Sequence, residues 1–156
     1  AAISPNNGIV LNNLALAEFL QGNYADARAK FQSSKEASVD PVNQDYVMGM
    51  YSIIDGDYTK AVQMMSNRSC DYNTALVQIL NKDYAAAKTT LDCITNVDAK
   101  TAYLKAVLAA RMKDEQAIYS NLATAIEKDA SLKKTAKRDA EFKKYRHTDA
   151  FKALVK

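Results

Sequence analysis

A pattern of six residues recurs along the chain and constrains its fold more than any other feature. Each copy has a turn pair, a tyrosine, two variable residues and an alanine: GNYADA at 22–27, GDYTKA at 56–61 and KDYAAA at 82–87. The first two alanines are 34 residues apart, and a degenerate fourth copy, KDEQAI, occupies 113–118. Because glycine and aspartate are poor helix formers, each copy predicts an interruption between two helices.

Small residues stand seven positions before each turn, and large apolar residues stand four positions after the last residue of each copy. The small residues are Ala15, Gly49, Ala75 and Ala106, and the large ones are Phe31, Met65, Leu91 and Leu122. Two antiparallel helices approach closely only where small side chains meet, so the pattern predicts a repeated helix–turn–helix hairpin. One hairpin cannot bury its apolar face alone, and neighbouring hairpins must therefore stack.

The chain resembles the tetratricopeptide repeat (TPR) family over roughly residues 9–129. The resemblance rests on the 34-residue period and on two segments, NNLALAEFLQGNYADARAKFQSSKEA and DYVMGMYSIIDGDYTKAVQMM. The resemblance implies a right-handed α-solenoid whose concave groove grips partner peptides. The later intervals are shorter, since 26 residues separate Ala61 from Ala87 and 31 separate Ala87 from Ile118. We therefore expect shortened helices or loops between the second and third units.

We predict an all-α protein, a TPR-like solenoid of about four helix hairpins closed by a C-terminal capping helix. It would form a single domain over residues 1–156, and its N-terminal sequence suggests one module of a longer protein. We expect Ser131 to be the N-cap of the capping helix, whose polar outer face would close the stack. The expected hairpins span 9–37, 43–67, 72–95 and 99–129, followed by the capping helix at 131–145 and a short helix at 148–155.

The sequence offers little for catalysis, and we expect no catalytic residues, no metal ligands and no cofactor. His147 is the only histidine, so a histidine relay or metal site would rest on one residue in a charged tail. The four glycines stand apart and form no phosphate-binding loop. Carboxylates flank two turns, Asp55 with Asp57 and Asp114 with Glu115, and we interpret them as helix caps.

The only two cysteines, Cys70 and Cys93, have positions compatible with a disulfide. Cys70 precedes the first expected helix of the third hairpin, and Cys93 lies near the end of the second. Those ends are neighbours in an antiparallel hairpin, so the pair can meet the geometric requirement for a disulfide. A disulfide would imply an oxidising compartment. Two independent, partly buried thiols are the alternative.

Three tyrosines recur in register, each three positions before the small residue of a unit. In the TPR resemblance this face of each first helix lines the concave groove. An aromatic stripe with free hydroxyls would suit an extended or helical peptide with apolar anchors. The alternative is that the tyrosines pack between adjacent repeats or are covered by a neighbouring domain of the same protein. The predicted groove residues are Tyr46, Met50, Tyr72, Tyr103, Val107 and Arg111.

Charge is distributed unevenly along the chain. Residues 1–99 carry 7 Lys and Arg against 11 Asp and Glu, whereas residues 100–156 carry 14 against 7. The stretch 133–146 has seven basic and two acidic residues but only two aromatic ones for base stacking, and such a run is typical of a solvated helix face. We therefore expect no nucleic-acid partner. No apolar run approaches the roughly 20 residues that span a bilayer, and we expect no membrane insertion.

These observations predict a non-catalytic interaction scaffold that binds a protein or peptide through its concave groove. A structural spacer or oligomerisation module with a self-filled groove is the alternative. Parts of the chain also resemble TPR segments of bacterial cell-envelope proteins. These parts are YNTALVQILNKDYAAAKTTLD, AYLKAVLAAR and the lysine-rich KRDAEFKKY. That resemblance implies a location in the periplasm or cell envelope, with the cytoplasm as the alternative.

Overall fold

The computed structural model describes residues 8–37 and 41–156, and over these residues the protein is all-helical, without a strand. The prediction of an all-α fold is confirmed. None of the helices in the described ranges has the length and apolarity to cross a membrane. The elements are α1 (Gly8–Leu20), α2 (Tyr24–Glu36), α3 (Pro41–Ile54), α4 (Tyr58–Met65), α5 (Tyr72–Leu80), α6 (Tyr84–Asp92), α7 (Ala99–Met112), α8 (Glu115–Lys128), α9 (Leu132–Arg138), the 3-10 helix η1 (Ala140–Phe142) and α10 (Asp149–Val155).

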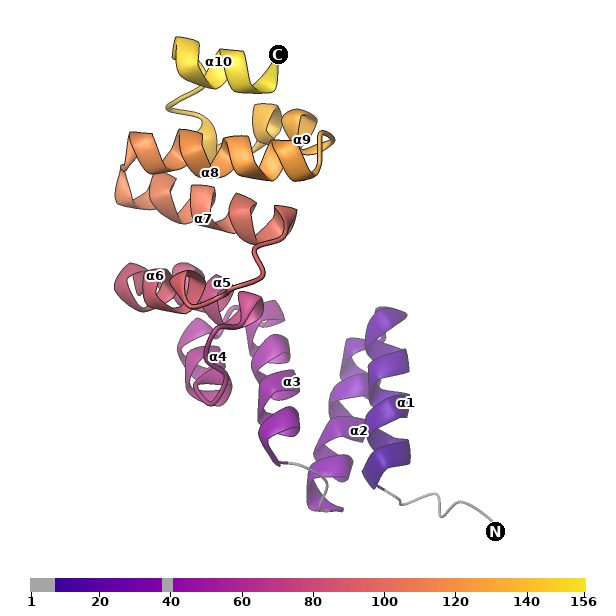
Figure 1. Ribbon diagram of the computed structural model, residues 1–156. Coiled ribbons are helices and arrows are strands. Elements are labelled where there is room, and N and C mark those ends of the chain that lie inside the picture. Colours follow the sequence, from indigo (N-terminus) through magenta and orange to yellow (C-terminus); the bar gives the residue numbers. More distant parts are fainter. Residues whose placement is uncertain (1–7, 38–40) are drawn as a thin grey trace. The chain divides into compact units, whose positions relative to one another are not determined.

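The chain divides into two compact units, with the boundary between Arg68 and Ser69. The first unit contains the hairpins α1–α2 and α3–α4, and the second contains α5–α6, α7–α8 and the C-terminal elements (Figure 1). The boundary falls where the repeat interval shortens to 26 residues. The flanking helices α4 and α5 have only 8 and 9 residues, as the shortened interval predicted. The single domain over residues 1–156 stays a prediction.

All four hairpins turn through the same backbone motif. The first residue of each turn pair adopts a left-handed conformation, and the N–H of the second donates to the carbonyl five residues earlier. These are the features of a Schellman motif, which satisfies the last carbonyls of the first helix. The degenerate fourth copy is therefore a true member of the series. The left-handed residues are Gly22 (φ +83°), Gly56 (φ +78°), Lys82 (φ +65°) and Lys113 (φ +62°).

Aspartate is the N-cap residue of most of the helices that follow a turn or a connection. The carboxylate of Asp57 caps α4 by accepting the N–H of Lys60 at 3.1 Å, and that of Asp114 caps α8 by accepting the N–H of Ala117 at 3.0 Å. Such a cap is worth about 1 kcal/mol. The interpretation of these two carboxylates as caps is confirmed. Asp55 instead forms an ion pair with Arg28, 2.6 Å from atom Oδ2 to atom Nη2.

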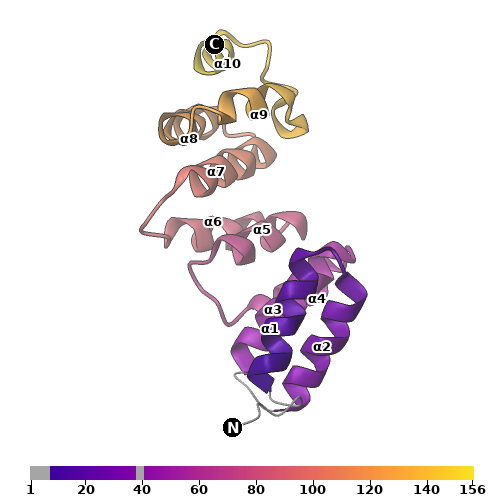
Figure 2. The ribbon, with the colours of Figure 1, turned by 90° about the vertical axis from the view of Figure 1, so that its right-hand side faces the viewer.

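The small residues predicted at the helix crossings are buried in every hairpin. Ala15, Ala75 and Ala106 have no exposed surface, and Gly49 is also buried. In the second unit α7 lies between the α5–α6 hairpin and α8, and α8 packs in turn against α9 and α10 (Figures 1 and 2). The apolar core of the second unit thus runs through successive layers of helices.

The C-terminal segment differs from the single capping helix predicted at 131–145. Helix α9 ends at Arg138, and Asp139 adopts an extended conformation before η1. The helix breaks because the Asp139 carboxylate accepts the N–H of Glu141, a local bond that competes with helical pairing. Ser131 occupies the expected N-cap position of α9, but its side chain forms no capping hydrogen bond, because its N–H and hydroxyl both donate to Asp129.

The left-handed lysines give a first testable prediction. Lys82→Gly and Lys113→Gly are each expected to raise the free energy of unfolding by about 0.5–1 kcal/mol, because glycine adopts positive φ without the steric cost of a Cβ. Urea denaturation measures the change. The matched control is Ala86→Gly inside α6, which is expected to lower stability by about 1 kcal/mol. A loss of stability in both lysine variants would contradict the prediction.

Candidate functional site

The predicted groove residues divide between the two units. Tyr46 and Met50 lie on α3 in the first unit, whereas Tyr72 lies on α5 and the other three lie on α7 in the second. We call the side of α5 and α7 that carries Tyr72, Tyr103, Val107 and Arg111 the first-helix face.

In the first unit, Tyr46 and Met50 are half-buried, one turn apart on α3. The guanidinium of Arg68 lies 4.3 Å from the centre of the Tyr46 ring, in a cation–π arrangement. The ring of Tyr46 is therefore engaged by a cation of its own unit. Sequence reasoning did not foresee this contact, because Arg68 lies 22 positions away in the linker after α4.

Tyr72 begins α5, directly after the capping residue Asp71. Its half-buried ring packs against the core of the α5–α6 hairpin, as does Tyr84 from the second helix of the same hairpin. Burial raises the pKa of Tyr72, and the negative charge of Asp98 adds to the increase. Tyr72 therefore presents a neutral hydroxyl on a ring that is fixed by packing.

Tyr103 is held by the C-terminal segment. Its hydroxyl donates to Oδ2 of Asp139 at 2.7 Å, and its ring meets that of Phe142 edge to face, with centroids 5.7 Å apart. Burial raises the pKa of Tyr103 far above its ordinary value, and the hydrogen bond to the Asp139 carboxylate raises it further. The hydroxyl that the sequence predicted to be available for a partner is thus already bound.

Arg111 joins three elements of the second unit. Its guanidinium binds both carboxylate oxygens of Glu141, with Nε–Oε2 at 3.1 Å and Nη2–Oε1 at 2.6 Å. Its Nη1 donates to the carbonyl of Ile79 at 3.2 Å, near the end of α5. Such two-pronged pairs are geometrically specific. The hydrogen bonds with Glu141 raise the pKa of Arg111, which stays cationic.

Val107 lies one turn after Tyr103 and packs against the C-terminal apolar cluster. Residues 139–142 therefore cover the α7 part of the first-helix face, whereas Tyr72 belongs to a different cluster one hairpin away. Sequence reasoning missed Asp139 and Glu141 as partners of Tyr103 and Arg111. A signal was present, because these are the two acidic residues within the basic stretch 133–146.

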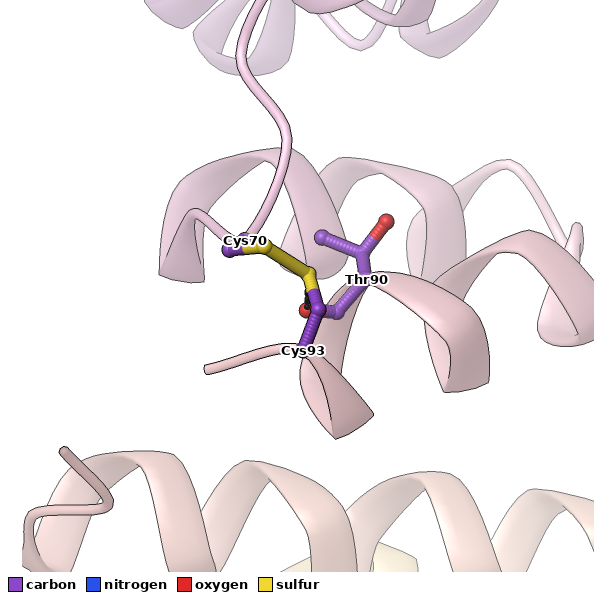
Figure 3. The surroundings of a disulfide bond; sticks show 3 residues. All are labelled: Cys70, Thr90 and Cys93. Atoms are coloured by element: carbon purple, nitrogen blue, oxygen red, sulfur yellow. Dashed lines mark hydrogen bonds between the residues drawn. A yellow bond between two sulfur atoms is a disulfide. The ribbon is translucent and has the colours of Figure 1, made fainter. Parts of the chain in front are cut away.

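Cys70 and Cys93 form a disulfide, with Cα atoms 5.1 Å apart (Figure 3). The bond links the residues just before α5 and just after α6 and thereby closes the α5–α6 hairpin. Atom Sγ of Cys93 also lies 3.2 Å from the carbonyl oxygen of Thr90. A disulfide sulfur carries no proton, so this approach is a contact and not a donated hydrogen bond.

The described residues contain no group of three or more His, Cys, Asp and Glu side chains arranged to hold a metal ion. His147 is exposed in the turn before α10. The carboxylates of Asp57 and Asp114 are bound as helix caps. What the structure gathers on the first-helix face is a tyrosine hydroxyl and a guanidinium that bind carboxylates of the same chain.

Tyr103 gives a prediction about alkaline stability. Its pKa in the folded protein lies above the value of about 10 in the unfolded chain, so its contribution to stability is complete below pH 10 and is lost as the pH rises beyond it. Tyr103→Phe is expected to cost about 1 kcal/mol at pH 8. It should also make the fall in unfolding free energy between pH 10 and 11.5 shallower.

Urea denaturation at several pH values measures both effects. Asp139→Asn is the matched control, because it removes the neighbouring charge but leaves the ring buried. This variant should reduce the fall in unfolding free energy between pH 10 and 11.5 only in part, since burial is the larger cause of the raised pKa of Tyr103. An unchanged alkaline fall in Tyr103→Phe would contradict the prediction.

No family model, no curated protein and no solved structure matches the chain.

Proposed function

We propose that the protein is a non-catalytic scaffold of the TPR type, a right-handed α-solenoid that binds a protein or peptide partner along its first helices. The repeated Schellman turns and the buried small residues at each crossing support the proposal, because they are the means by which similar hairpins are built in series. In this proposal the chain is one module of a larger protein.

One observation carries the proposal: the first-helix face already holds a short acidic segment, which runs from Asp139 through the 3-10 helix η1. Tyr103 binds Asp139 and Arg111 binds Glu141, while the Phe142 ring lies against Tyr103. The same chemistry, in which a tyrosine hydroxyl and a guanidinium donate hydrogen bonds to carboxylates, would hold a partner peptide. Tyr72 continues the face onto α5, within a different apolar cluster from Phe142.

The test compares two side chains of one hairpin. Tyr72 lies on the first helix and Ile94 lies after the second, and both pack half-buried against the same apolar cluster. Tyr72→Ala is expected to abolish the capture of at least one partner that the wild-type chain retains in an affinity experiment, whereas Ile94→Ala should retain it. Equal capture by both variants, with equal stability, would contradict a partner site on the first-helix face.

A second function has an observation in its favour. Tyr103, Val107 and Arg111 are engaged by residues of the same chain, as expected of a structural spacer or oligomerisation module with a self-filled groove. Under this alternative Tyr72→Ala would change stability but no binding property. The experiment on Tyr72 and Ile94 therefore separates the two functions.

We further propose a location in the periplasm or cell envelope. The Cys70–Cys93 disulfide supports it, because such bonds persist in oxidising compartments and are rare in the cytoplasm. Trapping thiols with a maleimide in intact cells tests the proposal. Two reactive thiols in the freshly trapped protein would favour the cytoplasmic alternative.

A further inference from the structure

The acidic and the basic side chains of the C-terminal stretch 133–146 lie in different surroundings. Both acidic residues of the stretch 133–146 are turned to α7, where Asp139 meets Tyr103 and Glu141 meets Arg111. The lysines that follow, Lys143 and Lys144, are exposed. The acidic side chains therefore serve the packing of the segment and do not neutralise its lysines.

A hollow of about 320 Å³ lies where the end of α7 meets η1 and the turn after it. Lys113 contributes from the α7–α8 turn, and Lys143 and Lys144 contribute from the turn after η1, while the Arg111–Glu141 pair forms part of the lining. Among the described residues, none forms an ion pair or side-chain hydrogen bond with these three lysines. Since Glu141 balances Arg111, the lining carries three uncompensated positive charges.

Three cations around one concavity disfavour one another, and an anion placed between them relieves that repulsion. Their closeness is fixed by the fold, because Lys113 takes the left-handed position of the α7–α8 turn and the Arg111–Glu141 pair ties η1 to α7. The hollow is thus a preformed place for negative charge. Its cations approach from two segments about 30 residues apart in the sequence.

We propose that this hollow binds a run of Asp or Glu side chains on a partner protein. The proposal rests on the scaffold function above and names the chemistry of its partner. One feature favours an acidic peptide over a nucleic acid. The neighbouring aromatic rings of Phe142 and Tyr145 are buried and offer no base a stacking surface.

The experiment uses the whole chain and a fluorescein-labelled hexaglutamate peptide, with binding followed by fluorescence anisotropy at low salt. The triple variant Lys113→Gln, Lys143→Gln and Lys144→Gln is expected to bind at least tenfold more weakly than the wild type. The matched control, Lys82→Gln, Lys100→Gln and Lys128→Gln, removes the same charge from exposed lysines outside the hollow and should weaken binding less than twofold. Hexaglutamine should not bind.

Equal weakening in the two triple variants would overturn the proposal, because it would show attraction by net charge alone. The absence of hexaglutamate binding by the wild type at millimolar concentration would also overturn it. Tighter binding of oligothymidylate or of phosphatidylglycerol vesicles, with the same dependence on the hollow lysines, would assign the site to phosphates instead. Failure here leaves the Tyr72 experiment unaffected, since the two sets of variants share no residue.

Discussion

Reduction of the Cys70–Cys93 disulfide is expected to lower the free energy of unfolding of the second unit by about 3 kcal/mol. The bond closes a loop with a sequence separation of 23, and the entropy that such a cross-link removes from the unfolded chain is of that size. For a unit of this length the melting temperature should fall by roughly 10–20 °C.

The α5–α6 hairpin is expected to depend more on the disulfide for its stability than the α7–α8 hairpin does. Its two helices have 9 residues each, whereas α7 and α8 have 14 each. Helices as short as those of α5–α6 are marginal without tertiary support. We therefore expect reduction to increase hydrogen exchange first in α5 and α6, ahead of α7 and α8.

Thermal denaturation and hydrogen exchange with and without reductant measure these effects on the whole chain. The control is the double variant Cys70→Ser and Cys93→Ser, which should match the reduced protein and ignore reductant. Two free thiols in the air-oxidised protein, or equal melting temperatures in both redox states, would contradict the prediction.

The parts of the fold that the sequence predicted are those governed by local rules. Gly22 and Gly56 mark left-handed turn residues because glycine alone accepts positive φ freely, and the spacing of the buried small residues Ala15 and Gly49 from those turns follows from helix geometry. Lys113 is not a glycine, but its turn was still predicted, because the small residue Ala106 lies seven positions before it. Local patterns therefore sufficed for the hairpins.

The candidate site could be predicted only in part, because its contacts join residues far apart in the sequence. Tyr103 was expected on the groove side of its helix, but its partner Asp139 lies 36 residues later. The break at Asp139 depends on a competition between a helical hydrogen bond and two side-chain contacts, and composition alone does not decide that competition. Helix propensity favoured a continuous helix across 131–145, and tertiary contacts overrode it.

Gly49→Ala is expected to destabilise the first unit, although alanine is the better helix former. A Cβ added at Gly49 would lie 2.5 Å from Cγ of Met65 and 3.3 Å from the carbonyl oxygen of Ala61. Met65 is 1% exposed, so its side chain has little room to move away. Overpacking of this kind costs about 1–3 kcal/mol, against a gain in helix propensity of about 1 kcal/mol.

A double-mutant cycle identifies the cause of the loss. Met65→Ala alone should cost about 2–5 kcal/mol, as expected for a large core side chain. In that background Cγ is gone, and Gly49→Ala should become neutral or stabilising by up to about 1 kcal/mol. Gly56→Ala is the matched control, because a Cβ there meets nothing within 4 Å and its cost comes from a φ of +78°, which Met65→Ala cannot relieve. If Gly49→Ala costs the same in both backgrounds, the close contact with Met65 does not explain why this hairpin carries glycine where the other three carry alanine.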